Sequence, residues 1–280
     1  MKVTFWGTRG SLASPGVDTS RYGGNTSCVA VEGSEGTMII LDAGTGIRNL
    51  GRSLPPDLKR VHILLTHLHM DHIQGLPFFA PLRRRGVEVH LWGPASTTLS
   101  LNARLQKYLS PPLFPVSVRE LSADLHFHEL PAQLIEIGEF LINAQLIIHP
   151  NPTIGYRIQC AGAAVTYLPD HEPALGERTF PHEKEWTSGY ALAEGADLLI
   201  HDSQFTEEEY QSRVGFGHSS IRQAFQFAEL TNVKHFAPFH YDPTHSDDEL
   251  DRMFEEMMAE LHPSYEMTPS REGLSLEVAC

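Results

Sequence analysis

The sequence predicts a layered α/β (α+β) protein, and three observations support this fold class. Apolar runs of strand length recur through the first two thirds of the chain. The last third adds two amphipathic helical patterns, and no internal repeat or low-complexity tract is found. The chain has 280 residues, 41% of them hydrophobic, which is enough for a substantial core. Many strands with helices toward the end of each half suit a layered sandwich.

Strands dominate the first third of the chain. Alternating or apolar runs predict strands at residues 3–8, 27–32, 37–42, 61–66 and 87–93. Among them, residues 61–66 form a continuous apolar run, which is typical of a central strand covered on both faces. Residues 72–86 indicate a broken helix, because Pro77 and Pro81 limit its regularity.

The middle of the chain is less regular. A helical patch lies around residues 100–108, and the prolines of SPPLFPV then predict an ordered but irregular loop. Whether residues 108–130 form a lid over a substrate stays open at this point. Further strands are expected at residues 134–148, 154–160, 163–168, 196–202, 234–240 and 273–279.

Two helices are expected in the last third. The serines at 219–220 can cap a helix whose apolar residues recur at helical spacing over residues 221–228. Ser246 and Glu249 form a capping-box pattern at the start of an amphipathic helix over residues 247–261. We interpret the methionines of this second helix as packing residues.

Composition and charge exclude several classes of protein. A formal net charge of −14 disfavours strong binding to duplex nucleic acid, because that affinity depends on Lys and Arg neutralising phosphates. No stretch approaches the roughly 18 uninterrupted apolar residues of a membrane span, and the N-terminus lacks the features of a signal peptide. Cys28, Cys160 and Cys280 are too scattered for a disulfide framework. We therefore expect a cytoplasmic protein with no membrane association.

The segment HLHMDH, residues 67–72, places three histidines and an aspartate directly after a buried apolar run. His67 and His69 are two residues apart, so they project from the same side of an extended strand end. Asp71 and His72 follow where the chain turns into a helix, and four ligands can therefore converge from one turn. In a chain with 16 histidines, such a match arises by chance on the order of once in several hundred sequences.

Three further candidate ligands follow predicted strands. His149, Asp170 and His240 each come directly after an apolar run, where a rigid scaffold can present them to one shared site. Each residue alone is equally consistent with an ordinary surface or hydrogen-bonded side chain. Imidazole and carboxylate groups suit first-row divalent metals, and a pair of metals needs more ligands than a single ion.

HLHMDH followed by His149, Asp170 and His240 resembles the metallo-β-lactamase superfamily, over nearly the whole chain. Further motifs resemble its ribonuclease Z-like and cyclic-nucleotide phosphodiesterase branch, and these are FWGTRGS, RYGGNTSC, LDAGTG, HPNPTIGYR, IHDSQFTEEEY, GFGHSS and FHYDPTHSD. The resemblance implies a single domain over residues 1–280, folded as a four-layer αββα sandwich. It also implies two mixed β-sheets with helices on the outer faces and metals at one edge.

The resemblance further implies two divalent metal ions. The ligands assigned to the first ion are His67, His69 and His149. Those assigned to the second ion are Asp71, His72 and His240. Asp170 would bridge both ions, and a hydroxide held between them would be the nucleophile, with Asp71 also counted among the catalytic residues. Zinc is the expected metal, and Mn and Fe are alternatives because ligand type alone does not separate them.

Other polar residues are assigned roles around this site. The resemblance implies that His218, in GFGHSS, donates a proton to the leaving oxygen or stabilises its charge, and that Asp202 orients the imidazole. The alternative for His218 is a role at the start of the following helix. Two sets of residues could serve either a substrate or the fold itself. The loop residues that could reach a phosphate or only form turns are Arg9, Asn25 and Ser27. The aromatic residues that could stack on a base or only pack a loop are Tyr108 and Phe114. The residues expected to support the ligand segment are Asp42 and Thr66.

The favoured function is a metal-dependent phosphodiesterase acting on a small phosphodiester such as a 3′,5′-cyclic nucleotide. The acidic charge and the His218 and Asp202 pair favour it over a ribonuclease Z-like RNA 3′-processing endonuclease, which is the alternative. A thioester or lactone hydrolase could use the same ligands but would not need His218. A β-lactamase is disfavoured, because Asp170 stands where zinc-dependent lactamases usually carry cysteine. A non-enzymatic module stabilised by metals is a further alternative, and the resemblance suggests a homodimer.

Overall fold

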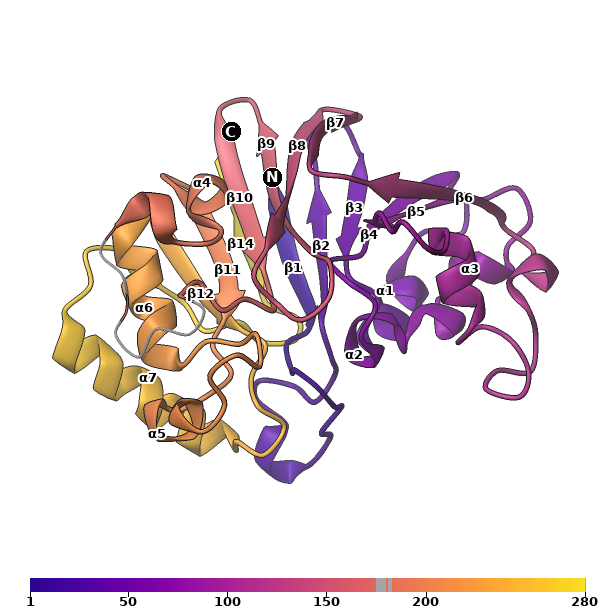
Figure 1. Ribbon diagram of the computed structural model, residues 1–280. Helices are drawn as coiled ribbons and strands as arrows, with labels where there is room; N and C mark the ends of the chain where they lie inside the picture. The colour runs from indigo at the N-terminus through magenta and orange to yellow at the C-terminus, as the bar shows by residue number, and fades with distance from the viewer. Residues whose placement is uncertain (175–179, 181–182, 280) are drawn as a thin grey trace.

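The computed structural model describes residues 1–174, 180 and 183–279, whose strands form two seven-stranded sheets (Figure 1). The first sheet consists, in spatial order, of β14 (Ser275–Glu277), β1 (Lys2–Gly7), β2 (Cys28–Glu32), β3 (Met38–Leu41), β4 (Arg60–Leu64), β5 (Glu88–Pro94) and β6 (Asp124–Leu130). The second consists of β13 (Glu266–Met267), β12 (His235–Phe239), β11 (Leu198–Asp202), β10 (Ala163–Leu168), β9 (Thr153–Cys160), β8 (Phe140–Ile147) and β7 (Gln133–Ile137).

Both sheets are mixed, and they share one pattern of pairing. In the first sheet, the pairs from β14 to β3 are antiparallel and the pairs from β3 to β6 are parallel. In the second sheet, the pairs from β7 to β10 are antiparallel and the pairs from β10 to β13 are parallel. Parallel strands have their carboxyl ends at the same end of a sheet. The loops that follow these strands therefore lie close together at one end of each sheet.

Helices cover the outer face of each sheet (Figure 1). The helices beside the first sheet are α1 (Ile47–Ser53), α2 (Met70–Ile73) and α3 (Leu101–Gln106). Those that follow the strands of the second sheet are α4 (Tyr190–Ala193), α5 (Glu207–Gln211), α6 (Ile221–Leu230) and α7 (Asp247–Leu261). Short 3₁₀ helices lie at Val17–Thr19, Leu76–Phe78, Ala80–Arg83, Val118–Glu120 and Lys184–Trp186.

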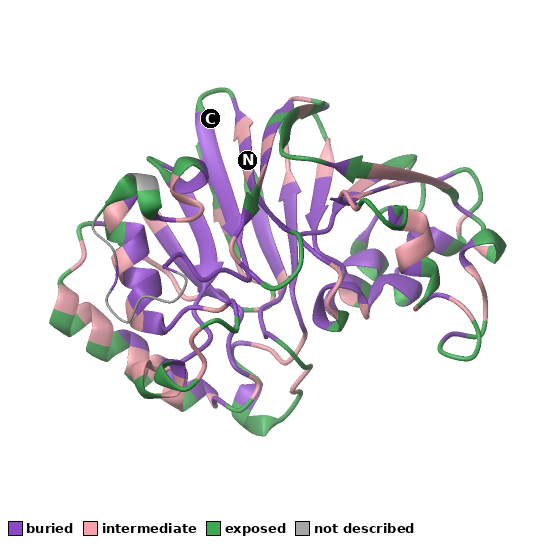
Figure 2. Cartoon of the chain, viewed as in Figure 1, coloured by how far each residue is buried: buried purple, intermediate pink, exposed green. Residues whose placement is uncertain are grey.

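Three apolar clusters hold these layers together. One lies between the two sheets and contains Phe5, Phe140 and Phe239. The second joins the first sheet to its helices, and the third joins the second sheet to α4, α6 and α7. Figure 2 shows the strands and α6 largely buried and the outward side of α7 exposed. The predicted four-layer αββα sandwich is therefore confirmed.

The predicted helix starts are confirmed in detail. Ser246 accepts a hydrogen bond from the backbone N–H of Glu249 at the start of α7, while the Glu249 carboxylate accepts one from the Ser246 backbone. Ser220 caps α6 in the same way with Gln223. The segment after residue 72 is also broken as predicted, into the short helix α2 and two 3₁₀ turns.

Three of the elements that the sequence did not predict are β6, α1 and α5. Residues 108–130, whose role the sequence left open, are built into the fold, because β6 completes the first sheet and Phe114 and Val118 pack into its outer cluster. Within the described residues, no helix combines the length and apolar character needed to cross a membrane.

Four histidines form a row across β4, β5 and β6 of the first sheet. His62 on β4, His90 on β5 and His126 on β6 are in register on adjacent parallel strands. Their rings stack, with centroids 4.6 Å apart between the first two and 4.5 Å apart between the last two. His128 continues the row, with its Nε2 atom 3.0 Å from Nδ1 of His90 and its ring stacked on Trp92. We call these four histidines the histidine row.

Candidate metal centre

The predicted ligands meet at one edge of the sandwich, where strands of both sheets end. The segment 67–72 follows β4 of the first sheet, and α2 begins within it with His69 as its N-cap. His149 follows β8, Asp170 follows β10, and His240 follows β12, all in the second sheet. The site therefore lies between the two halves of the chain.

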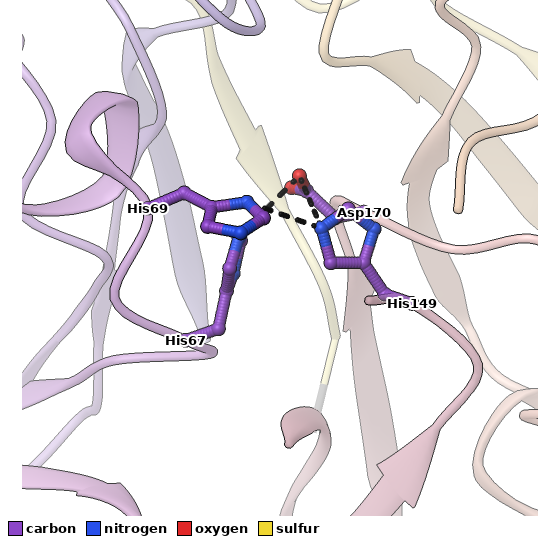
Figure 3. A group of neighbouring side chains, drawn as sticks. All are labelled: His67, His69, His149 and Asp170. Atoms are coloured by element: carbon purple, nitrogen blue, oxygen red, sulfur yellow. Dashed lines mark hydrogen bonds and ion pairs between the residues drawn. The ribbon is translucent and has the colours of Figure 1, made fainter. Parts of the chain in front are cut away.

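One group of side chains consists of His67, His69, His149 and Asp170 (Figure 3). Nε2 of His149 lies 3.3 Å from Nδ1 of His69. Oδ2 of Asp170 lies 3.7 Å from Nε2 of His67 and 3.7 Å from Nε2 of His149. These nitrogen and oxygen atoms surround a common point, as the ligands of a single ion would.

A second group consists of Asp71, His72, Asp170 and His240. Asp170 faces this group with its other oxygen, Oδ1, which lies 2.9 Å from Nε2 of His72 and 3.2 Å from Nε2 of His240. Oδ2 of Asp71 lies 3.2 Å from each of the same two nitrogens. Asp170 thus presents one carboxylate oxygen to each group, which is the arrangement that a bridging ligand requires.

The hydrogen bonds of the histidines test whether these groups fit metal ions. Nδ1 of His72 lies 2.8 Å from the Asp42 carboxylate, Nδ1 of His149 lies 2.7 Å from the Gly217 carbonyl, and Nδ1 of His240 lies 3.0 Å from Oε1 of Gln204. Each of these acceptors places the ring proton on Nδ1, so Nε2 carries a lone pair. Lone pairs that face one another and face carboxylates in a buried site need cations between them.

Two buried atoms support the same conclusion. Nε2 of His67 and Oδ1 of Asp170 have no hydrogen-bond partner among the described residues, although both residues are almost fully buried. Unpaired buried polar atoms are rare in proteins, and an ion is one of their ordinary explanations. The residues present therefore fit a pair of divalent cations.

The charge states of His67, His149 and Asp170 agree with this donor set. Burial lowers the pKa of His67 well below its ordinary value, and it lowers the pKa of His149 to about 4, so both rings are neutral near pH 7. Burial alone would raise the pKa of Asp170, but His240 and His72 lower it well below its ordinary value. The bridging position is therefore occupied by a charged carboxylate.

Asp42 supports the ligand segment from behind, as predicted. Its carboxylate accepts hydrogen bonds from the backbone N–H and hydroxyl of Thr66 and from the Tyr167 hydroxyl, in addition to Nδ1 of His72. The residue is fully buried. These contacts fix the tautomer and the orientation of His72, which is how a carboxylate behind a metal-binding histidine acts.

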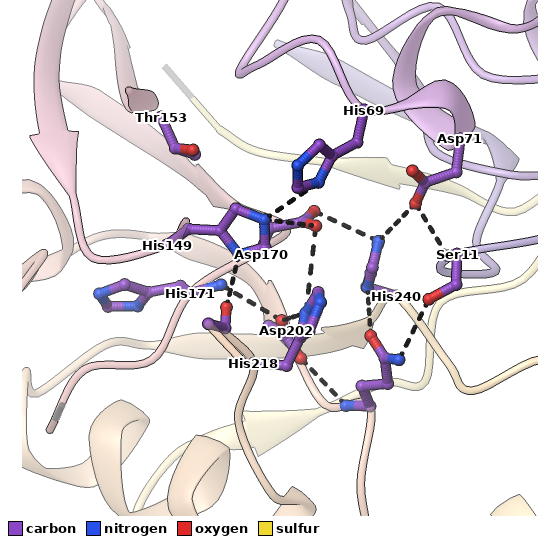
Figure 4. A network of polar contacts seen from close by, with 12 residues as sticks. Ser11, His69, Asp71, His149, Thr153, Asp170, His171, Asp202, His218 and His240 are labelled. Carbon is purple, nitrogen blue, oxygen red and sulfur yellow. Dashed lines mark hydrogen bonds and ion pairs between the residues drawn. The ribbon is translucent and has the colours of Figure 1, made fainter. Parts of the chain in front are cut away.

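His218 and Asp202 lie together beside the two groups (Figure 4). Nδ1 of His218 donates to Oδ2 of Asp202 at 2.7 Å and lies 4.0 Å from Oδ2 of Asp170. Burial lowers the pKa of His218, but Asp202 raises it more strongly, and the net pKa is about 9. The side chain is 13% exposed, and its Nε2 has no partner among the described residues. Asp202 thus holds the imidazole next to the candidate metal groups and favours its protonated form.

Sequence analysis missed Glu172, which is buried and accepts four hydrogen bonds. Its carboxylate binds the backbone N–H of Gly215 at 2.8 and 3.1 Å, that of Gly217 at 2.8 Å and the Tyr210 hydroxyl at 2.8 Å. Gly217 precedes His218, and its carbonyl accepts from His149. Gly217 has a φ of +86° and no room for a Cβ atom beside His149, so the loop depends on glycine there. An acidic residue two positions after Asp170 is the only signal the sequence offers.

Two more residues of the site escaped sequence analysis. Gln204 accepts from His240 and donates to the Ser11 hydroxyl at 3.2 Å, while the Ser11 backbone N–H donates to Oδ2 of Asp71 at 2.8 Å (Figure 4). This chain of contacts links His240 to Asp71, and both residues belong to the second group. Both residues lie in motifs that carry the family resemblance, FWGTRGS and IHDSQFTEEEY, but neither was assigned a role.

For the residues whose role stayed open between substrate and fold, the contacts favour the fold. Arg9 is fully buried and binds the Gly23 and His245 carbonyls and the Asp247 carboxylate at 2.9 Å. Asn25 binds Glu272, and Ser27 is buried. The two aromatic candidates also serve the fold. Tyr108 donates to the Gln74 carbonyl, and Phe114 packs edge-on against Phe78.

Comparison with known proteins agrees with the chemistry of this site. The domain model described as the β-lactamase superfamily domain matches residues 37–241, so the chain belongs to this superfamily. It is a metal-dependent hydrolase with a site built from histidine and aspartate.

Relatives extend over most of the chain. Ribonuclease Z from Staphylococcus epidermidis is 23% identical, covering 92% of this chain and 94% of its own, and ribonuclease Z from Haloarcula marismortui is 26% identical, covering 86% of each. Among solved structures, the metallo-β-lactamase fold protein YhfI from Bacillus subtilis has a TM-score of 0.72 at 20% identity, covering 98% of both chains. The short form of human tRNase Z has a TM-score of 0.67 at 21% identity over the full length of both chains. Zn²⁺-bound PqqB from Methylobacterium extorquens has a TM-score of 0.69 at 18% identity, covering 99% of this chain and 100% of its own.

Proposed function

We propose that this protein hydrolyses phosphodiester bonds in small nucleotides, with 3′,5′-cyclic nucleotides as the reference substrates. The observation that carries the proposal is His218, whose Nδ1 is bound by the Asp202 carboxylate beside two groups of metal ligands. A proton donor at this place serves a reaction in which an oxygen leaves with negative charge. Phosphodiester cleavage is such a reaction.

The proposal assigns the first ion to His67, His69 and His149 and the second to Asp71, His72 and His240, with Asp170 shared. We expect both ions to be zinc, because imidazole and carboxylate ligands suit it and a related structure contains it. When bound, two such ions withdraw electrons from phosphoryl oxygens and make water a stronger acid. Asp71 and Asp170 supply the negative charge that keeps the ions in place.

In the proposed reaction, a water molecule releases one proton to solvent, its oxygen adds to phosphorus, and the bond from phosphorus to the leaving oxygen breaks. Nε2 of His218 gives its proton to that leaving oxygen. Asp202 keeps the proton on Nδ1, so the neutral ring that results still faces the substrate with its Nε2 atom. His218 then regains a proton from solvent before the next turnover.

An RNA 3′-processing endonuclease is the second candidate. The relatives named ribonuclease Z favour it, because they align over nearly their full length. The formal charge of −14 argues against it, since gripping a large RNA requires basic surface. A thioester or lactone hydrolase finds less support, because such a reaction does not need the His218 and Asp202 pair.

The test is to compare rates on 3′,5′-cyclic AMP, a chromogenic diester, a thioester and precursor transfer RNA with the metal-loaded protein. His218→Ala should slow cleavage of the diesters by about 10²- to 10⁴-fold. The matched control is His262→Asn, which removes an exposed histidine whose positive φ asparagine tolerates. Hydrolysis of the thioester alone, or an unchanged diester rate in His218→Ala, would reject the proposal. Faster cleavage of precursor transfer RNA than of the small diesters would favour the second candidate.

A further inference from the structure

A cavity of about 300 Å³ opens beside the first ligand group. His67 and His69 form part of its wall, so a substrate whose phosphodiester sits at the ligands extends directly into it. Leu68, Pro94 and Pro152 contribute apolar walls. The cavity is thus placed to bind the part of a substrate that does not react.

Arg104 is the one permanently charged side chain among the residues that line this cavity. It projects from α3, and its Nη2 atom donates to the Pro94 carbonyl, which fixes the guanidinium at the cavity wall. Nε is buried without a hydrogen-bond partner, and Nη1 has none within the described part of the chain. The side chain is 17% exposed. Arg104 therefore has donors that the protein itself does not satisfy.

The nearest acid contacts only one nitrogen of this guanidinium. Oε1 of Glu129 lies 3.5 Å from Nη2 of Arg104, but the same oxygen accepts a hydrogen bond of 2.6 Å from the backbone N–H of Leu101. The chain has a net charge of −14, so a positive charge beside the candidate active site favours the binding of anionic ligands there. A guanidinium with free N–H groups matches phosphate oxygens better than any other common anion-binding side chain.

We propose that Arg104 binds a second phosphate of the substrate, so that the preferred substrates are nucleotides with one phosphodiester and one further phosphate. This inference rests on the proposed phosphodiesterase activity. The apolar walls formed by Leu68 and Pro152 take the nucleoside between the two phosphates. Asn151, which also lines the cavity, offers an amide to the sugar or the base.

Two chromogenic substrates that differ by one phosphate test this inference. They are the p-nitrophenyl ester of thymidine 5′-phosphate and the same ester carrying a 3′-phosphate. The wild-type protein should have a lower KM for the bisphosphate. Arg104→Gln should reduce that preference about tenfold, the usual worth of a charge-assisted hydrogen bond, and Arg104→Lys should reduce it less. Lys107→Gln is the matched control, because it removes an exposed cation just after the same helix and should leave the preference unchanged.

Equilibrium binding separates this inference from the proposed activity. Thymidine 3′,5′-bisphosphate should bind the metal-loaded protein more tightly than thymidine 5′-phosphate, and Arg104→Gln should abolish the difference. If the wild-type protein cleaves neither ester but keeps this binding preference, the activity is wrong and the phosphate site stands. If the preference is the same in wild type and Arg104→Gln, by KM or by binding, the phosphate site is wrong.

Discussion

At the scale of single residues, the second nitrogen of each histidine matters as much as the first. Asp42, Gly217 and Gln204 each hold one Nδ1 atom and so direct the opposite Nε2 lone pair of His72, His149 or His240 toward the site. Those acceptors come from three different parts of the chain. The ligand geometry is therefore set before any ion binds, which reduces the ordering that binding requires.

Glu172 gives the prediction that belongs to this scale. Glu172→Gln keeps the size of the side chain but turns an amide N–H₂ toward the backbone N–H groups of Gly215 or Gly217, so the loop before His218 should shift. We expect kcat for diester cleavage to fall by about ten- to a hundredfold, with a smaller change in KM. The pH profile of kcat should also move, because His218 would lose its fixed distance from Asp202.

Steady-state kinetics across pH provide the measurement, with circular dichroism to confirm folding. Glu208→Gln is the matched control, since Glu208 is an exposed acid on the neighbouring helix α5. A Glu172→Gln protein with normal kcat and a normal pH profile would show that the hydrogen bonds of Glu172 to Gly215 and Gly217 do not position His218.

The candidate ligands could be predicted from sequence because each lies in a short local pattern. HLHMDH is compact, and His149, Asp170 and His240 each follow an apolar run. Glu172, Gln204 and Arg104 could not be predicted in this way. Their roles depend on contacts with residues more than 30 positions away, or on a cavity shared with a distant segment, and no local spacing reports such contacts. The role of Arg9 stayed open for the same reason, because its partners lie near residue 245.

At the scale of elements, β6 shows why a strand can escape prediction. Its sequence, DLHFHEL, alternates polar and apolar residues, but most of its side chains are only half-buried. The preceding prolines of SPPLFPV favoured an irregular loop. What places the strand is the parallel pairing with β5, in which His126 and His128 stack on His90. That pairing is invisible to a local pattern.

The histidine row predicts how stability depends on pH. Burial, followed by the neighbouring His90, lowers the pKa of His62 to about 4, and burial lowers the pKa of His90 and His128 as well. Because the unfolded chain titrates near the ordinary value of about 6.5, it binds more protons than the folded chain below that pH. The free energy of unfolding should therefore fall as the pH drops from about 6.5 toward about 4.

Urea unfolding at about pH 7.5 and about pH 5 measures this effect. Replacing His62 and His90 by glutamine should reduce the loss of stability between these pH values by on the order of 1 kcal/mol, after allowance for their partial exposure. Because the metal ligands are unchanged, their own pH dependence cancels in the comparison with wild type. His262→Asn should give the wild-type difference. An identical pH dependence in the double variant would rule out the row as its source.

At the scale of the whole molecule, each ligand group takes residues from both halves of the chain. The first group combines His67 and His69 with His149, and the second combines Asp71 and His72 with His240. The two sheets are otherwise joined by the apolar cluster between them. Metal binding should therefore stabilise the contact between the sheets as well as the site itself.

Removal of metal provides the test. Treatment with a chelator should lower Tm by several degrees or more, and returning zinc should restore it, because an ion that binds only the folded state stabilises that state. Differential scanning calorimetry gives the shift, and elemental analysis gives the number of ions. A variant with His67→Ala and His240→Ala serves as the control and should show no response to the chelator. Equal Tm values for the wild-type protein with and without metal would mean that the ions do not connect the sheets.

The two halves of the molecule share one pattern of strand pairing but contribute ligands differently. The first half supplies four of the seven from the single segment 67–72, and the second half supplies three from the ends of three separate strands. Withdrawal of one short piece of chain would therefore remove more than half of the donors at once, while the strand-end donors stay in place. The route by which ions enter and leave should pass through that piece, and the rate of metal exchange should follow its local opening rather than the global unfolding of the protein.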